Sequence, residues 1–205
     1  MHVRAFGGLT LYRHTTPVMI SWESQKARRL FCYLMIACDQ WVHRDRLMAL
    51  LWPAFDYDRR KRNFMTTLTR LRTSLQMFRQ LNPILSRGDA YQLNFETVTC
   101  DYCIFRKEAA AGIRHMIHDD PGHAKAHLQT AVELYTAEFL PEEPADQVIV
   151  TAKAQVSELF DTAVGYLEKI YLAEGRADLL PSLRCPSRFA AYMPDRGQDE
   201  ETRGS

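Results

Sequence analysis

Residues 58–78 read DRRKRNFMTTLTRLRTSLQMF, a segment whose two faces differ in chemistry. Its apolar side chains recur at the helical period, at Phe64, Leu68, Leu71 and Leu75. At about 100° per residue, the polar side chains that point the other way are Arg59, Arg62, Asn63, Thr66, Arg70 and Thr73. No acidic residue follows Arg59 before Phe78, so this face has no internal ion pair. The segment predicts a helix that suits phosphates and base edges, although an ordinary solvated helix would show the same pattern.

The net charge of +1 hides a strong asymmetry along the chain. Residues 1–97 carry 15 Lys and Arg against 7 Asp and Glu, whereas residues 98–205 carry 11 against 18, which gives formal charges of +8 and −7. A basic half joined to an acidic half predicts two modules with different partners, the first of which favours polyanions. The sequence has neither a long apolar run nor a secretory signal pattern, so we expect no membrane span and no secretory signal. Its five cysteines form an odd set without a framework pattern, which favours a cytoplasmic, reducing compartment.

The segments around this helix predict a winged-helix domain over residues 1–97. Short strands are expected at 3–13 and 18–20, helices at 25–38 and 43–52, and a hairpin at 84–95 that turns at Gly88. In the second helix we expect Leu47, Leu50 and Leu51 to face inward. In a winged helix the third helix enters the major groove and the hairpin reaches the adjacent backbone.

Residues 98–180 predict an all-helical domain. The periodicity indicates helices over 102–118, 123–135 and 145–174. The polar, proline-containing segment 181–205 is expected to be a disordered tail.

Several short motifs resemble one bacterial family. They are Lys26-Ala27-Arg28-Arg29-Leu30, Arg44-Asp45-Arg46-Leu47, Leu50-Leu51-Trp52-Pro53, Leu68-x-Arg70-Leu71-Arg72 after Asn63, and Gly88-x-x-Tyr91-x-Leu93. They resemble the OmpR-type winged helix of Streptomyces antibiotic regulatory proteins. The segment Ala131-x-x-Leu134-Tyr135-x-x-Glu138-Phe139-Leu140-Pro141 is similar to the bacterial transcriptional activation domain that follows it in that family. The resemblance covers about residues 1–178.

The resemblance implies a fold class that is mainly α with small β. A winged helix-turn-helix domain is followed by an all-α, tetratricopeptide-like domain that here is shorter than in the family. The implied function is a cytoplasmic transcriptional regulator, and more specifically an activator. The implied partners are double-stranded DNA, RNA polymerase and a second copy bound through the helical domain.

The sequence departs from the family pattern at three places. His43 stands where Ser or Thr commonly caps the second helix, and Val148 stands where an aromatic usually begins the long helix. The helical array also stops early, which would leave an apolar face unpaired. We therefore infer that Leu167, Ile170 and Tyr171 either meet a partner chain or cap the fold in an unusual way. A sequence that is part of a longer protein is a further interpretation.

The family interpretation divides the basic residues into two groups. The candidates for base contact are Arg62, Asn63, Thr66, Arg70 and Thr73, because Arg and Asn can each make paired hydrogen bonds to a base edge. The candidates for phosphate contact are Arg59, Arg60, Lys61 and Arg87. The alternative hypothesis is a helical interaction scaffold whose winged helix docks protein and not DNA.

Metal binding and catalysis receive little support from the sequence. Cys100 and Cys103 form a lone C-x-x-C, and Cys32 is expected to be a small core residue. His123 and His127 have a spacing that can bind zinc, but we interpret the His-rich segment as a surface turn. No motif for catalysis or phosphate binding is present, so we expect no enzyme, cofactor or metal.

Overall fold

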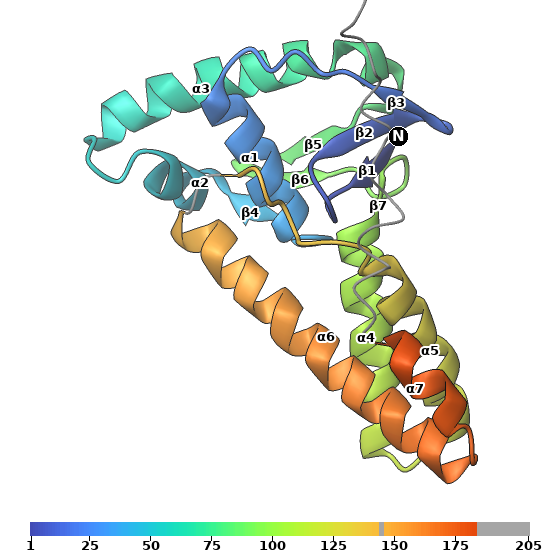
Figure 1. Ribbon diagram of the computed structural model, residues 1–205. Coiled ribbons are helices and arrows are strands. Elements are labelled where there is room, and N and C mark those ends of the chain that lie inside the picture. The colour runs from blue at the N-terminus through green and yellow to red at the C-terminus, as the bar shows by residue number, and fades with distance from the viewer. Residues whose placement is uncertain (144–145, 184–205) are drawn as a thin grey trace, which may run out of the picture.

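The computed structural model describes residues 1–143 and 146–183, and its fold is mainly helical with two small sheets (Figure 1). One sheet has the strand order β3-β2-β1-β7, in which β7 pairs parallel to β1 and the other neighbours are antiparallel. Its strands are β1 (His2–Arg4), β2 (Thr10–Arg13), β3 (Thr16–Val18) and β7 (Thr99–Cys100). The N-terminal sheet therefore includes a strand that lies beyond residue 97, where the sequence placed the domain boundary.

Three helices and a hairpin follow in the order that the sequence predicts. The helices are α1 (Gln25–Ile36), α2 (Arg44–Leu51) and α3 (Tyr57–Ser74), and a 3-10 helix, η1 (Gln76–Leu81), follows α3. The second sheet has the order β4-β6-β5, with β4 (Val42–His43), β5 (Ile84–Arg87) and β6 (Ala90–Leu93). The hairpin turns through Gly88, whose φ of +57° suits glycine. This arrangement confirms the winged-helix prediction.

Three local predictions for this region need correction. The expected helix over 58–78 ends at Ser74 and continues as a separate 3-10 turn, although its apolar stripe stays buried as far as Leu75. Leu50 is 37% exposed, and Met48 faces the core in its place because α2 presents its 47, 48 and 51 positions inward. The third strand covers 16–18, two residues earlier than expected, and Met19 is 98% exposed.

The caps of α2 and α3 show how the chain specifies these helix starts. His43 caps α2, because its Nδ1 accepts a hydrogen bond from the Asp45 N–H at 3.2 Å. An imidazole thus performs the role that Ser or Thr commonly has at this position. Asp56 caps α3 in the same way, since its carboxylate accepts from the Arg59 N–H at 2.9 Å.

The second half of the chain is helical, as predicted. Helices α4 (Asp101–Ile117) and α5 (Pro121–Leu134) form an antiparallel hairpin, and the long α6 (Gln147–Ala173) starts near α2 and runs diagonally to the far end of this hairpin (Figure 1). A 3-10 helix, η2 (Ala177–Leu179), leads into the short α7 (Leu180–Leu183). The first three residues of the expected tail thus lie in a helix, and the remainder of that tail falls outside the described residues.

The apolar face at the end of α6 is covered within the chain itself. Leu167, Ile170 and Tyr171 are at most 5% exposed. They share a core cluster with residues of α5 and with Leu183 of α7. Of the two alternatives drawn from the sequence, the structure thus has the internal cap.

The aromatic side chain of Phe6, just after β1, packs against the helical half. Phe6 is 1% exposed, and its ring centroid lies 5.4 Å from that of Phe105, 5.2 Å from that of Tyr135 and 5.9 Å from that of Phe139. The adjacent Gly7 has φ +83°, and a Cβ there would lie 3.2 Å from the Cβ of Ala137. Because glycine permits this tight approach, the two halves share one continuous core.

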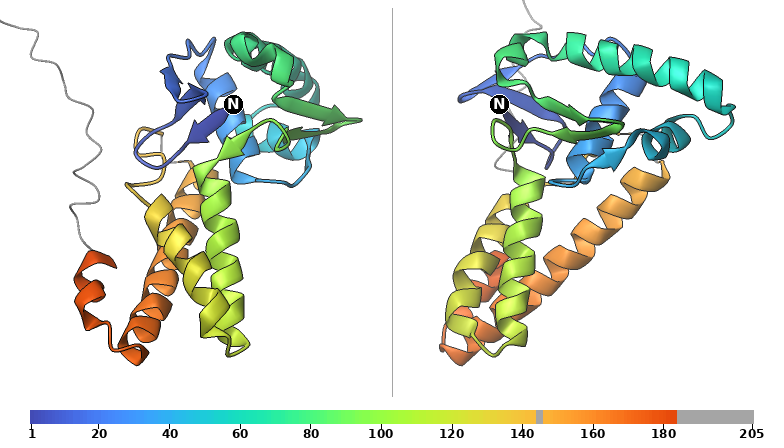
Figure 2. Two further views of the ribbon diagram at one scale, coloured as in Figure 1. Left: turned by 90° about the vertical axis from the view of Figure 1, so that its right-hand side faces the viewer. Right: turned by 180° about the vertical axis from the view of Figure 1, so that it is seen from behind.

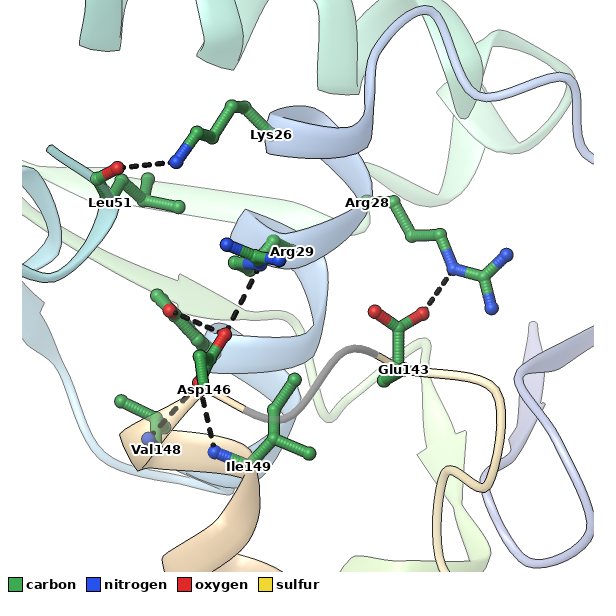
Figure 3. Close-up of polar contacts among 9 residues, drawn as sticks. Lys26, Arg28, Arg29, Leu51, Glu143, Asp146, Val148 and Ile149 are labelled. Atoms are coloured by element: carbon green, nitrogen blue, oxygen red, sulfur yellow. Dashed lines mark hydrogen bonds and ion pairs between the residues drawn. The ribbon is translucent and has the colours of Figure 1, made fainter.

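Polar contacts of α1 also hold the N-terminal half against the segment that precedes α6 (Figure 3). Arg28 forms ion pairs with Glu142, at 2.7 Å, and with Glu143. Arg29 pairs with Asp146 at 3.2 Å, and Asp146 also accepts the first backbone N–H groups of α6. Part of the positive charge of residues 1–97 is therefore neutralised inside the molecule by the acidic segment before α6.

We predict that Arg28→Ala lowers the free energy of unfolding by about 3 kcal/mol. The Glu143 side chain is 3% exposed, so removal of Arg28 would leave a buried carboxylate without its cation. Urea denaturation measures the loss, and Arg46→Ala, on the exposed face of α2, should change stability by less than about 0.5 kcal/mol. Equal effects of the two substitutions would contradict this role.

A buried carboxylate holds the β1–β2 turn on α4. Asp101 is 6% exposed and accepts hydrogen bonds from the backbone N–H groups of Ala5, at 2.8 Å, Phe6, at 3.2 Å, and Tyr102, at 2.6 Å. Burial raises the pKa of the Asp101 carboxyl to about 6, although the three N–H donors oppose that rise.

This raised pKa predicts a pH-dependent stability. The ordinary pKa of Asp is about 3.9, so the stabilisation from protonated Asp101 is complete below about pH 4 and is lost as the pH rises through about 6. We expect the unfolding free energy of the wild type, relative to that of Asp101→Asn, to fall by roughly 2–3 kcal/mol between about pH 4 and about pH 7. Urea titrations at each pH measure this difference, and a constant difference would be inconsistent with it.

Candidate nucleic-acid interface

The exposed face of α3 is the candidate interface. Its apolar stripe is almost completely buried, with Phe64 and Leu71 at 0%, Leu75 at 1% and Leu68 at 2% exposure. Burial of this stripe leaves six of the predicted contact residues exposed, which are Arg59, Lys61, Arg62, Thr66, Arg70 and Thr73. Asn63 is half-buried at the edge of the face. The sequence pattern thus predicted the exposure of these side chains.

The position of α3 in the molecule favours access by a large ligand. α3 lies at one end of the molecule, and the turn between α4 and α5 lies at the other (Figures 1 and 2). The helical half therefore does not cover the outer face of α3. Among the described residues, neither Arg62 nor Arg70 forms an ion pair with a carboxylate.

Arg60 has a different environment from its neighbours. Its Nε donates to the Trp52 carbonyl at 2.8 Å and its Nη2 to the Pro53 carbonyl at 2.5 Å. These carbonyls follow the C-terminal end of α2, where a cation is favoured by the helix dipole. The guanidinium of Arg60 thus holds the α2–α3 loop, and the structure separates it from the exposed cations with which the sequence grouped it.

Two of the other cations rest on aromatic rings. The Arg59 guanidinium carbon lies 3.9 Å from the centroid of Phe55, and that of Arg87 lies 4.7 Å from the centroid of Trp41. Such cation–π contacts orient a guanidinium while its remaining N–H groups stay available to solvent or to a ligand. Both side chains are therefore partly ordered in the free protein.

The threonines of α3 use their hydroxyl protons inside the helix. Thr66 donates to the carbonyl of Arg62 at 3.2 Å, Thr69 to that of Met65 at 3.0 Å, and Thr73 to that of Thr69 at 3.1 Å. Each of these hydroxyl groups keeps lone pairs that can accept a hydrogen bond, and each threonine also carries a methyl group. A methyl group of this kind can contact the thymine methyl in a major groove.

The hairpin tip is held to the start of α2. Arg44 pairs with Asp89 through Nη1, at 2.7 Å, and Nη2, at 3.0 Å, and its backbone N–H donates to the Asp89 carbonyl at 2.6 Å. This bidentate ion pair fixes the Gly88–Asp89 turn and neutralises the acidic charge beside Arg87.

The sequence analysis named Arg44 only within a family motif and assigned it no role, and it did not name the exposed Met65 and Thr69 on α3. Met65 and Thr69 each follow a buried stripe residue by one position, so their helical angle could have revealed them. The partner of Arg44 lies 45 residues away in the hairpin turn, and no local signal indicates that pairing.

A solved structure has the same arrangement: a helix with one buried face in the place of α3, then a hairpin and a helical half. The chain is similar in fold to EmbR. Mycobacterium tuberculosis EmbR, determined in complex with a low-affinity phosphopeptide, aligns with a TM-score of 0.66 and 22% sequence identity over 88% of this chain. The alignment covers 48% of EmbR, so this chain spans about half of EmbR's length.

At this level of identity, the similarity to EmbR establishes the fold. It shows a mainly helical chain in which an N-terminal winged-helix region precedes a helical region, as the sequence predicted. No protein-family model and no curated protein matches the chain. Across residues 1–143 and 146–183, none of the helices combines the length and the apolar character needed to cross a membrane.

We predict that Arg60 and Lys61 differ in their effect on stability. Arg60→Ala removes two hydrogen bonds to carbonyls at the end of α2 and should lower the unfolding free energy by about 1–2 kcal/mol. Lys61→Ala, on the exposed face, should change it by less than about 0.5 kcal/mol. Chemical denaturation of both variants makes the comparison, and a larger loss for Lys61→Ala would refute the assignment.

Proposed function

We propose that this protein is a sequence-specific DNA-binding transcriptional regulator. In this proposal the outer face of α3 enters the major groove of double-stranded DNA and the β5–β6 hairpin lies on the adjacent backbone. The observation that carries the proposal is the exposed face of α3, where Arg62 and Arg70 project from a helix whose other side is buried. At about 1.5 Å per residue, the 18 residues of α3 are long enough to lie along a groove.

The proposal assigns different roles to the exposed residues. Arg70 and Arg62 would read guanine through O6 and N7, and Asn63 would read adenine through N6 and N7. Thr66 and Thr73 would supply methyl contacts and acceptors at the same face. Arg59, Lys61 and Arg87 would hold phosphates, which provides affinity without choosing the sequence. Arg60 is not included, because its guanidinium is occupied at the end of α2.

The fold shared with EmbR supports a regulator of the Streptomyces antibiotic regulatory protein type, in agreement with the motifs of the sequence. Within that type, we propose activation through the acidic helical half, which would recruit RNA polymerase. A second copy could not bind through Leu167, Ile170 and Tyr171 unless α5 and α7 moved, since these residues are buried within the chain. Any homo-oligomer would therefore use another surface.

The first test measures binding as a function of salt. A duplex selected from a random oligonucleotide pool should bind more weakly as salt rises, with a log–log slope of about −0.9 for each phosphate neutralised. Arg70→Ala should cost about 1–3 kcal/mol on the selected duplex and much less on random duplex, because it removes a base contact. Lys61→Ala should weaken both equally, because a phosphate contact carries no sequence choice. Equal losses for Arg70→Ala on both duplexes would rule out base reading by that residue.

A second candidate function is a protein-interaction scaffold, in which the winged helix docks another protein. The exposure of Tyr57, at 51%, and of Met65, at 48%, on α3 favours it, because such apolar surface suits a protein partner. Fluorescence anisotropy with mixed genomic duplex at about 50 mM salt separates the two functions. Binding supports the regulator, and its absence supports the scaffold.

A further inference from the structure

Three metal-ligating side chains meet at the turn between α4 and α5, far from the outer face of α3. One donor atom from each of His115, Asp120 and His123 lies within 4.8 Å of the other two. An oxygen of Asp120, Oδ2, lies 3.1 Å from Nδ1 of His115 and 2.8 Å from Nδ1 of His123. In both imidazoles, therefore, Nδ1 faces the same carboxylate oxygen.

The fold holds these three side chains on ordered elements. His115 is in the last turn of α4, and His123 is in the first turn of α5. Asp120 caps α5 by accepting the backbone N–H of His123 at 3.2 Å, and Asp119 reverses the chain with φ +56°. Because the ligands belong to helix ends and a cap, little conformational entropy would be lost when an ion bound.

A glycine brings the two helices close enough for the cluster to form. Gly112 faces α5, and a Cβ there would lie 2.6 Å from Cγ of Leu128. A larger residue at position 112, about one helical turn before His115, would force Leu128 of α5 to move. The close helix packing and the side-chain cluster are thus parts of one local arrangement.

Two further residues support the cluster from behind. The ring of His127 stacks on that of His115 with centroids 5.6 Å apart and an angle of 9°. Nδ1 of His127 lies 2.6 Å from Oε2 of Glu108. His127 is therefore engaged with a carboxylate of α4, and the His123/His127 pair that the sequence singled out is not the convergent set.

We propose that His115, Asp120 and His123 form a binding site for a divalent transition-metal ion, with Zn²⁺ the best match to two imidazoles and one carboxylate. Tetrahedral zinc with bonds of about 2.0–2.2 Å needs ligand atoms about 3.4 Å apart. The contacts of 3.1 Å and 2.8 Å to Asp120 would have to lengthen by about 0.3 Å and about 0.6 Å. The His123 side chain is 78% exposed, so water completes the coordination.

Binding at this site joins the end of α4 to the start of α5. The ion replaces the protons that the imidazole nitrogens now share with Asp120, so it must compete with protonation. The site stabilises the helical hairpin and is separate from the proposed DNA contacts.

The experiment is a calorimetric titration of Zn²⁺ into the full, untagged chain at neutral pH, with the melting temperature as a second readout. The wild type should bind one ion at this site and melt at a higher temperature when loaded. His123→Gln and Asp120→Asn should each weaken binding at this site by at least about 10-fold and abolish the thermal shift. Asn retains an acceptor for capping α5, so the second variant should still fold. His118→Gln, an exposed residue of the same turn, is the matched control and should bind as the wild type does.

The thiols of the chain need a control of their own. Cys38, Cys100 and Cys103 line one cavity of about 480 Å³, and thiolates also bind zinc. Cys103→Ser should retain the site and its thermal shift if the histidines hold the ion. The proposal is overturned if His123→Gln binds as the wild type does, if Cys103→Ser alone loses the ion, or if no heat of binding is detected. None of these outcomes depends on DNA binding, so the result is independent of the proposed function.

Discussion

The burial of one stripe of α3 determines which residues of the winged helix can meet a ligand. Phe64, Leu68, Leu71 and Leu75 are at most 2% exposed, and each contributes roughly 1.5–3 kcal/mol when it leaves water. Since the stripe can be buried in only one rotation of the helix, that rotation also directs Arg62 and Arg70 to solvent. The burial of the apolar stripe that stabilises the domain therefore also orients the polar face of α3 and exposes these arginines to solvent.

The basic residues of the N-terminal half have two different roles, and the environment of each residue explains its role. On α1, Arg28 and Arg29 pair with the acidic segment that precedes α6, and one of the carboxylates there is 3% exposed. Such pairs hold the two halves together and contribute little to the external field. On α3 the cations other than Arg60 face water, where they retain their charge for a polyanion. The charge of +8 over residues 1–97 thus overstates the positive surface that a ligand would meet.

The contacts between the two halves of the chain pack them together as one unit. Phe6 packs among three aromatic rings of the helical half, and Asp101 receives three backbone N–H groups, two of them from the segment around Phe6. Asp146 links Arg29 of α1 to the first turn of α6. These contacts connect α6 to α1, on which α3 packs. The turn between α4 and α5, with its histidine cluster, lies at the far end of this unit (Figure 1).

The sequence alone determined the order of elements, the buried stripe of α3 and the exposure of its polar face, because helical periodicity is a local property. It also indicated the hairpin turn, since Gly88 carries a local conformational preference. Only the tertiary structure decided that Arg60 serves α2, that Arg44 holds the hairpin, and that Leu167 and its neighbours are covered by α5 and α7. Each of these outcomes depends on a contact between residues that sit on different elements. Periodicity assigns a side chain to a face, but the partner on that face is chosen by how the elements pack.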